Sequence, residues 1–81
     1  MPEPYEAVIS RAAEATGTRP MLPAEADALL ALARRVAHSS DDRRSAPLVC
    51  ALVGEALSAI DDPGERLARI AAVAELFSGG E

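Results

Sequence analysis

Apolar residues recur at steps of three and four positions along four segments of this chain, and proline, glycine or a polar run separates the segments. This spacing places the apolar side chains on one face of an α-helix, which has about 3.6 residues per turn. A chain of 81 residues has room for one small domain. We therefore predict an all-α fold, a bundle of four short amphipathic helices. The predicted helices cover residues 4–16, 24–38, 46–60 and 63–77 of a single domain, 1–81, with a tail at 79–81.

Local signals support these helix boundaries. Gly17 can adopt the left-handed conformation that ends a helix, and Ser45 is the expected N-cap of the third helix. Asp62, followed by Pro63 and Glu65, gives the clearest start signal in the chain. Because a very short linker joins the third and fourth helices, we expect these two to form an antiparallel hairpin.

The width of the apolar face differs between the segments. The first segment has a narrow face, formed by Tyr5, Val8, Ile9, Ala12 and Thr16. The third segment has an apolar arc of about half the helix circumference, formed by Leu48, Val49, Leu52, Val53, Ala56, Leu57 and Ile60. We therefore expect the third helix to be central, either as the most buried helix or as one that serves two interfaces.

Charge and composition exclude several classes of function. Eight basic and thirteen acidic residues give a formal net charge of -5, which argues against a nucleic-acid backbone or an anionic membrane surface as partner. No segment approaches the ~20 continuous apolar residues of a membrane-spanning helix. The N-terminal residues lack a secretory signal, and the single Cys50 suits a reducing compartment. We expect a cytoplasmic protein.

The residues that carry catalysis or bind metals are too few for a site. His38 is the only histidine, whereas a metal site needs three or four suitable ligands. We expect His38 to interact with the end of the second helix and Cys50 to fill the core. A carrier protein would need a serine at the start of the second helix to receive phosphopantetheine, and residues 23–27 contain none. The sequence therefore predicts no catalytic residues, no cofactor and no metal.

A local basic patch is the main candidate for contact with a partner. Four of the eight basic residues, with the histidine nearby, lie at the end of the second helix and in the loop that follows. Arginine side chains can bind carboxylate or phosphate with two parallel hydrogen bonds, although Asp41 and Asp42 could neutralise them internally. Leu76 is expected on the charged side of the fourth helix. The candidate partner contacts are Arg34, Arg35, His38, Arg43, Arg44 and Leu76.

One part of the sequence resembles a known family. Residues 29–38 read Leu-Leu-Ala-Leu-Ala-Arg-Arg-Val-Ala-His, residues 44–48 read Arg-Ser-Ala-Pro-Leu, and residues 52–54 read Leu-Val-Gly. This pattern resembles an uncharacterised family of short helical proteins from GC-rich bacteria, whose members are encoded near, or fused to, proteins similar to the molybdenum cofactor guanylyltransferase. The resemblance covers about a third of the chain. It implies an accessory role beside a larger enzyme, with Arg34, His38 and Pro47 as shared positions.

These observations favour a non-catalytic protein-interaction or accessory domain that acts beside a larger protein, through a protein partner or through self-association. Two alternatives stay open. One is a small-molecule-binding or enzyme-subunit domain with a pocket near the loop between the second and third helices. The other is a regulator of the antitoxin or anti-sigma type.

Overall fold

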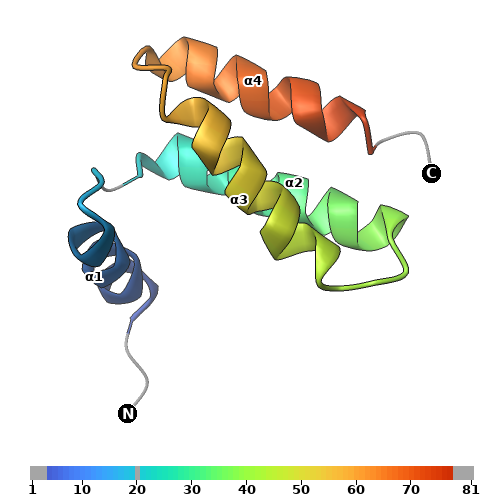
Figure 1. Ribbon diagram of the computed structural model, residues 1–81, viewed down its shortest axis with the longest axis horizontal. Coiled ribbons are helices and arrows are strands. Elements are labelled where there is room, and N and C mark those ends of the chain that lie inside the picture. Colours follow the sequence, from blue (N-terminus) through green and yellow to red (C-terminus); the bar gives the residue numbers. More distant parts are fainter. Residues whose placement is uncertain (1–3, 20, 78–81) are drawn as a thin grey trace.

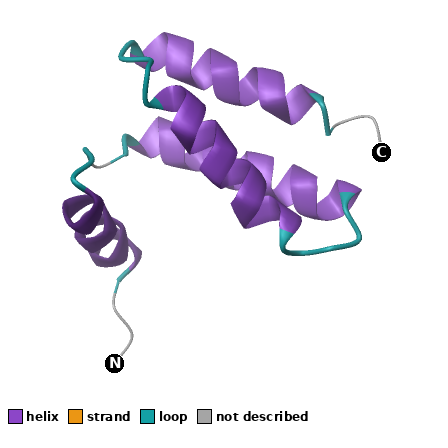
Figure 2. Cartoon of the chain, in the orientation of Figure 1, coloured by secondary structure: helices purple, strands orange, loops and turns teal. Residues whose placement is uncertain are grey.

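The computed structural model describes residues 4–19 and 21–77, which form four helices (Figure 1). The helices are α1 (Tyr5–Thr16), α2 (Pro23–Ser39), α3 (Ser45–Leu57) and α4 (Pro63–Glu75). The part of the chain that is described contains no strand (Figure 2). The predicted all-α fold is therefore confirmed, and each predicted boundary lies within three residues of the observed one. The predicted tail at 79–81 lies outside the described residues.

Two of the three predicted helix-end signals are confirmed. Gly17 ends α1 with a left-handed φ of 70°, and its N–H donates to carbonyl groups of the last turn. The carboxylate of Asp62 accepts a hydrogen bond from the backbone N–H of Glu65 at 2.9 Å, which satisfies one free donor at the start of α4. The predicted N-cap at Ser45 is wrong, because Ser45 is the first residue of α3 and Arg44, with helical φ and ψ of -67° and -18°, precedes it.

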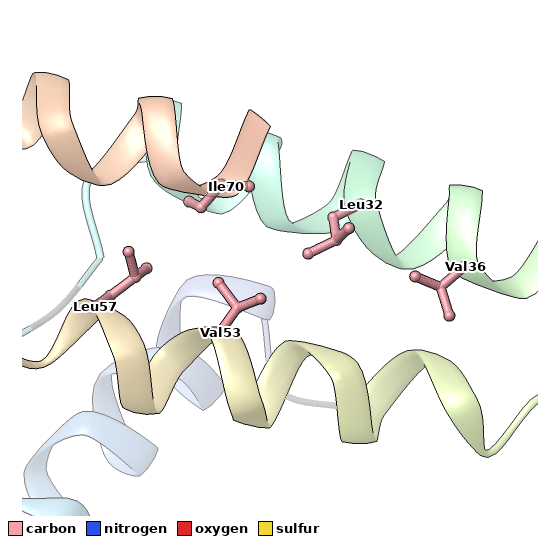
Figure 3. Packing of buried hydrophobic residues seen from close by; sticks show 5 residues of the cluster. All are labelled: Leu32, Val36, Val53, Leu57 and Ile70. Carbon is pink, nitrogen blue, oxygen red and sulfur yellow. The ribbon is translucent and has the colours of Figure 1, made fainter. Parts of the chain in front are cut away.

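The core lies between α2 and the two helices that pack on it. Leu32 and Val36 of α2 meet the other buried side chains of the cluster (Figure 3), namely Val53, Leu57 and Ile70. Full burial of one such side chain contributes about 1.5–3 kcal/mol. Both α3 and α4 contact α2 extensively and each other only sparsely. The central helix is therefore α2, and the expectation that α3 is central is wrong, while a second interface on α3 stays a prediction.

The helices α2 and α4 lie side by side and run in the same direction. Near their starts, Arg66 of α4 pairs with Glu25 of α2. Near their ends, Ser39 Oγ donates a hydrogen bond to the carbonyl oxygen of Phe77 at 3.0 Å. Between them in sequence, α3 returns across α2 in the opposite sense (Figure 1). Since α3 and α4 share so few contacts, their hairpin packing stays a prediction.

The first helix stands apart from this arrangement (Figure 1). Within residues 4–19 and 21–77, no helix-to-helix contact joins α1 to α2, α3 or α4. Tyr5 is 53% exposed and Val8 46%, and Ala13 is the buried residue of α1. The apolar face predicted on α1 is therefore largely open, with Ile9 partly buried, because the amphipathic pattern indicates which face is apolar but not whether a neighbour covers it. We call α2, α3 and α4 the three-helix body.

Candidate functional site

A buried ion pair joins all three helices of the body. The guanidinium of Arg66 binds the carboxylate of Glu25 through two hydrogen bonds, Nε to Oε1 at 2.8 Å and Nη2 to Oε2 at 3.0 Å. Its remaining nitrogen, Nη1, donates to the carbonyl oxygens of Leu57 and Ile60 at 2.6 and 2.7 Å. These carbonyl groups lie at the end of α3, where a helix leaves acceptors without partners. We call this arrangement the Glu25–Arg66 clamp.

The clamp is largely shielded from water and strongly charge-assisted. The side chain of Glu25 is 10% exposed and that of Arg66 is 19% exposed. Hydrogen bonds from Arg66 hold the pKa of the Glu25 carboxyl below its ordinary value, against the opposing effect of burial. The same bonds raise the pKa of Arg66. Both groups therefore stay charged at neutral pH, and among the described residues every buried side-chain nitrogen and oxygen has a hydrogen-bond partner. This is a structural element, not a reactive one.

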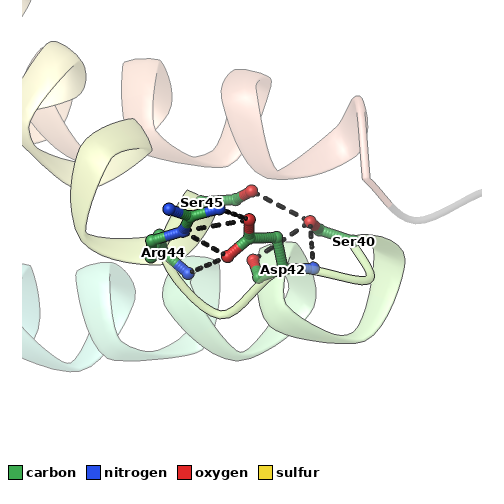
Figure 4. A network of polar contacts seen from close by, with 4 residues as sticks. All are labelled: Ser40, Asp42, Arg44 and Ser45. Carbon is green, nitrogen blue, oxygen red and sulfur yellow. Dashed lines mark hydrogen bonds and ion pairs between the residues drawn. The ribbon is translucent and has the colours of Figure 1, made fainter.

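The loop between α2 and α3 carries a second polar network (Figure 4). The carboxylate of Asp42 accepts hydrogen bonds from Arg44, from the backbone N–H at 2.9 Å and from Nε at 2.9 and 3.0 Å. The hydroxyl groups of Ser40 and Ser45 lie 2.9 Å apart. Hydrogen bonds from Arg44 also lower the pKa of Asp42. The network holds the loop in place immediately before α3. It takes the place of the N-cap that the sequence predicted at Ser45.

The structure assigns intramolecular partners to two of the four arginines in the predicted basic patch. Arg44 pairs with Asp42, as the sequence allowed. Arg35 reaches across to α4, where Nη1 donates to the carbonyl oxygen of Ala74 at 3.3 Å. Arg34 and Arg43 are exposed. The patch is therefore partly used within the chain, and its role as a partner contact stays a prediction.

The two residues with potential reactivity are not joined into a site. His38 is exposed on α2. Cys50 is half-buried beside α2, with Sγ 3.9 Å from the carbonyl oxygen of Leu29, and burial raises the pKa of its thiol. A raised pKa lowers the reactive thiolate fraction. Among the described residues, no group of three or more histidine, cysteine, aspartate or glutamate side chains gathers as metal ligands.

Two exposed leucines lie on α3. Leu48 and Leu52 of α3 are 64% and 66% exposed, although they belong to the apolar arc that the sequence places on this helix. The inner side of α3 is formed by Val49, Val53 and Leu57, which face the core. The arc is therefore two adjacent stripes, one packed and one open to solvent.

Further apolar residues are exposed elsewhere. Leu76 is 76% exposed at the end of α4, as expected. Leu30 of α2 is 51% exposed, and Met21 and Leu22 are exposed in the connector before α2. A shallow hollow lies on α1 and is lined by Val8, Arg11, Ala12, Glu14 and Ala15. The open apolar surface is therefore distributed over α1, the connector before α2, α2 itself, α3 and the end of α4.

Comparison with known proteins does not extend this description. No family model, no curated protein and no solved structure matches this chain. No helix in residues 4–19 or 21–77 combines the length and the apolar character that crossing a bilayer requires. Function must therefore be inferred from the geometry and charge of the described residues.

Proposed function

We propose that this chain is a non-catalytic protein-interaction domain that acts as an accessory of a larger protein, and that α1 is the segment that binds the partner. The three-helix body is the folded base. The amphipathic helix α1 is presented beside it, with its apolar side uncovered. The resemblance of residues 29–54 to an uncharacterised family of short helical proteins implies the same kind of role.

The isolation of α1 is the observation that carries this proposal. A helix of 12 residues is close to the lower limit of stability in water, and most helices in proteins gain stability by packing an apolar face. No helix of the body covers this face, and Tyr5 and Val8 are about half exposed. Helices of this type commonly bind by laying the apolar face into a groove of another protein.

The alternatives gain less support from the geometry. A small-molecule pocket near the α2–α3 loop would need free polar groups, whereas Ser40, Asp42, Arg44 and Ser45 bond to one another there. A regulator of the antitoxin or anti-sigma type would also bind a protein through an exposed helix. The identity of the captured protein separates that alternative from an accessory role.

Affinity capture from the source cells with matched baits tests the proposal. We expect the unchanged chain to enrich one protein repeatedly, and we expect the double variant Tyr5→Ser/Val8→Ser to lose it. The control Ser10→Ala, on the polar side of α1, should retain the partner. With the purified partner, backbone amides of α1 should exchange more slowly in the complex.

Two results would contradict the proposal. Capture that is equally strong with the Tyr5→Ser/Val8→Ser bait would show that α1 does not form the contact. A nucleotide or metabolite that raises the melting temperature of the isolated chain would instead favour the small-molecule alternative.

A further inference from the structure

One exposed stripe of α3 has an order of residues that is complementary to itself. Arg44, Leu48, Leu52 and Glu55 follow one another at steps of four, four and three, so they lie on the same side of the helix. Arg44 belongs to this side because its backbone already has helical φ and ψ. All four residues are exposed, and this side faces away from the inner residues Val49, Val53 and Leu57. We call these four residues the α3 outer stripe.

The stripe has a basic residue at one end, an acidic residue at the other and two leucines between them. If two copies of α3 are placed side by side and antiparallel, with a twofold axis midway between Leu48 and Leu52, each Leu48 lies opposite Leu52 of the second copy. The position opposite Arg44 is then 56 of the second copy, so Arg44 lies one residue, about 1.5 Å along the axis, from Glu55 of that copy, and the reverse pair forms by symmetry. A parallel arrangement would place like charges together. The stripe therefore fits an isologous contact with twofold symmetry.

We propose that the α3 outer stripe is a self-association surface, on which a second copy of this chain packs its own α3 antiparallel. This contact uses a different surface from the α1 contact proposed above and does not depend on it. A dimer so formed would present two copies of α1 to the larger partner.

The surroundings of the stripe permit close approach of two helices. Ala51 and Ala56 flank the leucines on either side, and both are exposed. Small flanking residues let two helix axes approach to about 8 Å, the lower end of the usual range. The larger side chains Val53 and Leu57 lie on the opposite, inner side of α3, in the core of their own copy, and take no part in this contact.

The charges at the ends of the stripe are available for this contact. Arg44 binds Asp42 through Nε and Nη2, and Nη1 is not part of that pair. A guanidinium has five N–H donors, so the same side chain can hold Asp42 and a second carboxylate. Such local pairing opposes the repulsion between two copies that each carry a net charge of -5. This charge pattern is also the reason that a second copy of the chain fits the α3 outer stripe better than an apolar surface without charges.

The contact is small, so the dimer should be weak. One pair of helices with two leucines each buries less than the ~1,200 Å² at the lower end of stable interfaces. We therefore expect a monomer–dimer equilibrium that depends on protein concentration.

Sedimentation of the full chain over about two orders of magnitude in concentration tests the proposal, because mass action shifts such an equilibrium. We expect dimer to form at the upper end. Leu48→Ser/Leu52→Ser should remain monomeric throughout, whereas Leu30→Ser, which alters a leucine of similar exposure on α2, should dimerise like the unchanged chain. Circular dichroism should show the same helix content for all of them.

Charge exchange tests the antiparallel register without disturbing the leucines. Arg44→Glu and Glu55→Arg should each weaken the dimer about tenfold or more, because each creates two like-charge contacts. The double variant Arg44→Glu/Glu55→Arg should restore it, since opposite charges again face each other only in the antiparallel arrangement. This rescue cannot arise from a folding defect.

Three outcomes would overturn the proposal. They are a strict monomer at every concentration, a dimer that Leu48→Ser/Leu52→Ser leaves intact, and a dimer that is lost instead in Leu76→Ser. Each would leave the proposed partner contact of α1 unaffected. Conversely, Tyr5→Ser/Val8→Ser should dimerise normally, so either proposal can fail alone.

Discussion

The three-helix body and α1 use the same kind of amphipathic sequence with different results. In the body, five side chains are buried together and one arginine joins α2, α3 and α4. In α1, a helix of similar length to α3 and α4, Ala13 is the buried residue, Ile9 is partly buried, and Tyr5 and Val8 are exposed. The chain thus combines a packed base with a helix that has no helical neighbour among residues 4–19 and 21–77.

This difference shows that the apolar spacing of a sequence predicts a helix and its apolar face, but not whether another element covers that face. Leu32 is fully buried because side chains from α3 and α4 meet it, whereas Val8, in an equally regular position of α1, meets none of these helices. The body should therefore unfold as one cooperative unit, and α1 should contribute little to its stability.

Removal of the Glu25–Arg66 clamp should have the largest effect on the body. Arg66→Met leaves a buried carboxylate without its partner and removes the donor to the carbonyl groups of Leu57 and Ile60. Breaking a buried pair on one side costs about 3–5 kcal/mol. A domain this small holds about the same total stability, so the variant should be largely unfolded by circular dichroism.

Two control variants show whether the loss of stability in Arg66→Met comes from the unpaired buried charge or from altered packing. Arg69→Met, at an exposed site on the same helix, should unfold at nearly the unchanged denaturant concentration. Glu25→Leu/Arg66→Met removes both charges and should recover much of the lost stability, because no buried charge is left alone. A stable Arg66→Met single variant would show that the clamp is not the link between the three helices.

Truncation of the core should come next in size. Leu32→Ala removes a side chain with no exposure at all and should lower the free energy of unfolding by about 2–5 kcal/mol. The control Leu30→Ala, two positions away and half exposed, should cost far less. Urea denaturation followed by circular dichroism measures both. If Val8→Ala in α1 destabilised the body as much as Leu32→Ala does, the separation between α1 and the body would be refuted.

Lowering the pH should weaken the body through Glu25. Its pKa in the folded protein lies below its ordinary value of 4.5, so near that pH the unfolded chain binds more protons than the folded one. Stability is therefore fully present above pH 4.5 and is lost as the pH falls through the folded pKa. The loss should be smaller than that of Arg66→Met, because a protonated carboxyl can still accept a hydrogen bond from Arg66.

Denaturation of Glu25→Gln at the same pH values isolates this contribution. Its stability should change less between neutral pH and the acid range than that of the unchanged chain. The pKa of Asp42 is also lowered, so its protonation should lower the stability of the chain in acid as well. Asp42→Asn removes that contribution and leaves the clamp intact, so it is the control for Glu25→Gln. An equal acid dependence in the unchanged chain and in Glu25→Gln would show that the clamp is not the acid-sensitive element.

The features that depend on local chemistry could be predicted from the sequence. The helix type follows from the apolar spacing, and the ends at Gly17 and Asp62 follow from backbone conformation and capping. The inner stripe of α4 also follows, since Ile70 lies at the centre of its apolar face. The exposure of Leu76 was predictable for the same reason. The stripe predicted on α2 is correct only in part, because Leu32 and Val36 are buried but Leu30 and Ala37, which the apolar spacing also places on it, are exposed.

The features that depend on contacts between helices could not be predicted in the same way. The wide arc of α3 does not reveal that Leu48 is open and Val49 is packed, because periodicity gives the width of an arc and not which half a neighbour covers. A signal for the clamp was nevertheless present. Glu25 is in register with Leu32, and Arg66 with Ile70, so opposite charges extend two core stripes near the helix starts. Pairing them would have indicated the parallel arrangement of α2 and α4.

The smallest expected effect on the body concerns the end of α1. Gly17→Ala places a side chain at a φ of 70°, which costs roughly 1–2 kcal/mol for a residue other than glycine. Apart from the two chain neighbours of Gly17, no atom of residues 4–19 or 21–77 lies within 4 Å of the added Cβ, so the cost comes from the backbone conformation. We expect faster amide exchange in α1 and an unchanged unfolding midpoint for the body. If the protection of amides in α2 and α4 fell together with that of α1, the two regions would be one cooperative unit, and the partner surface would have to be sought on the body instead.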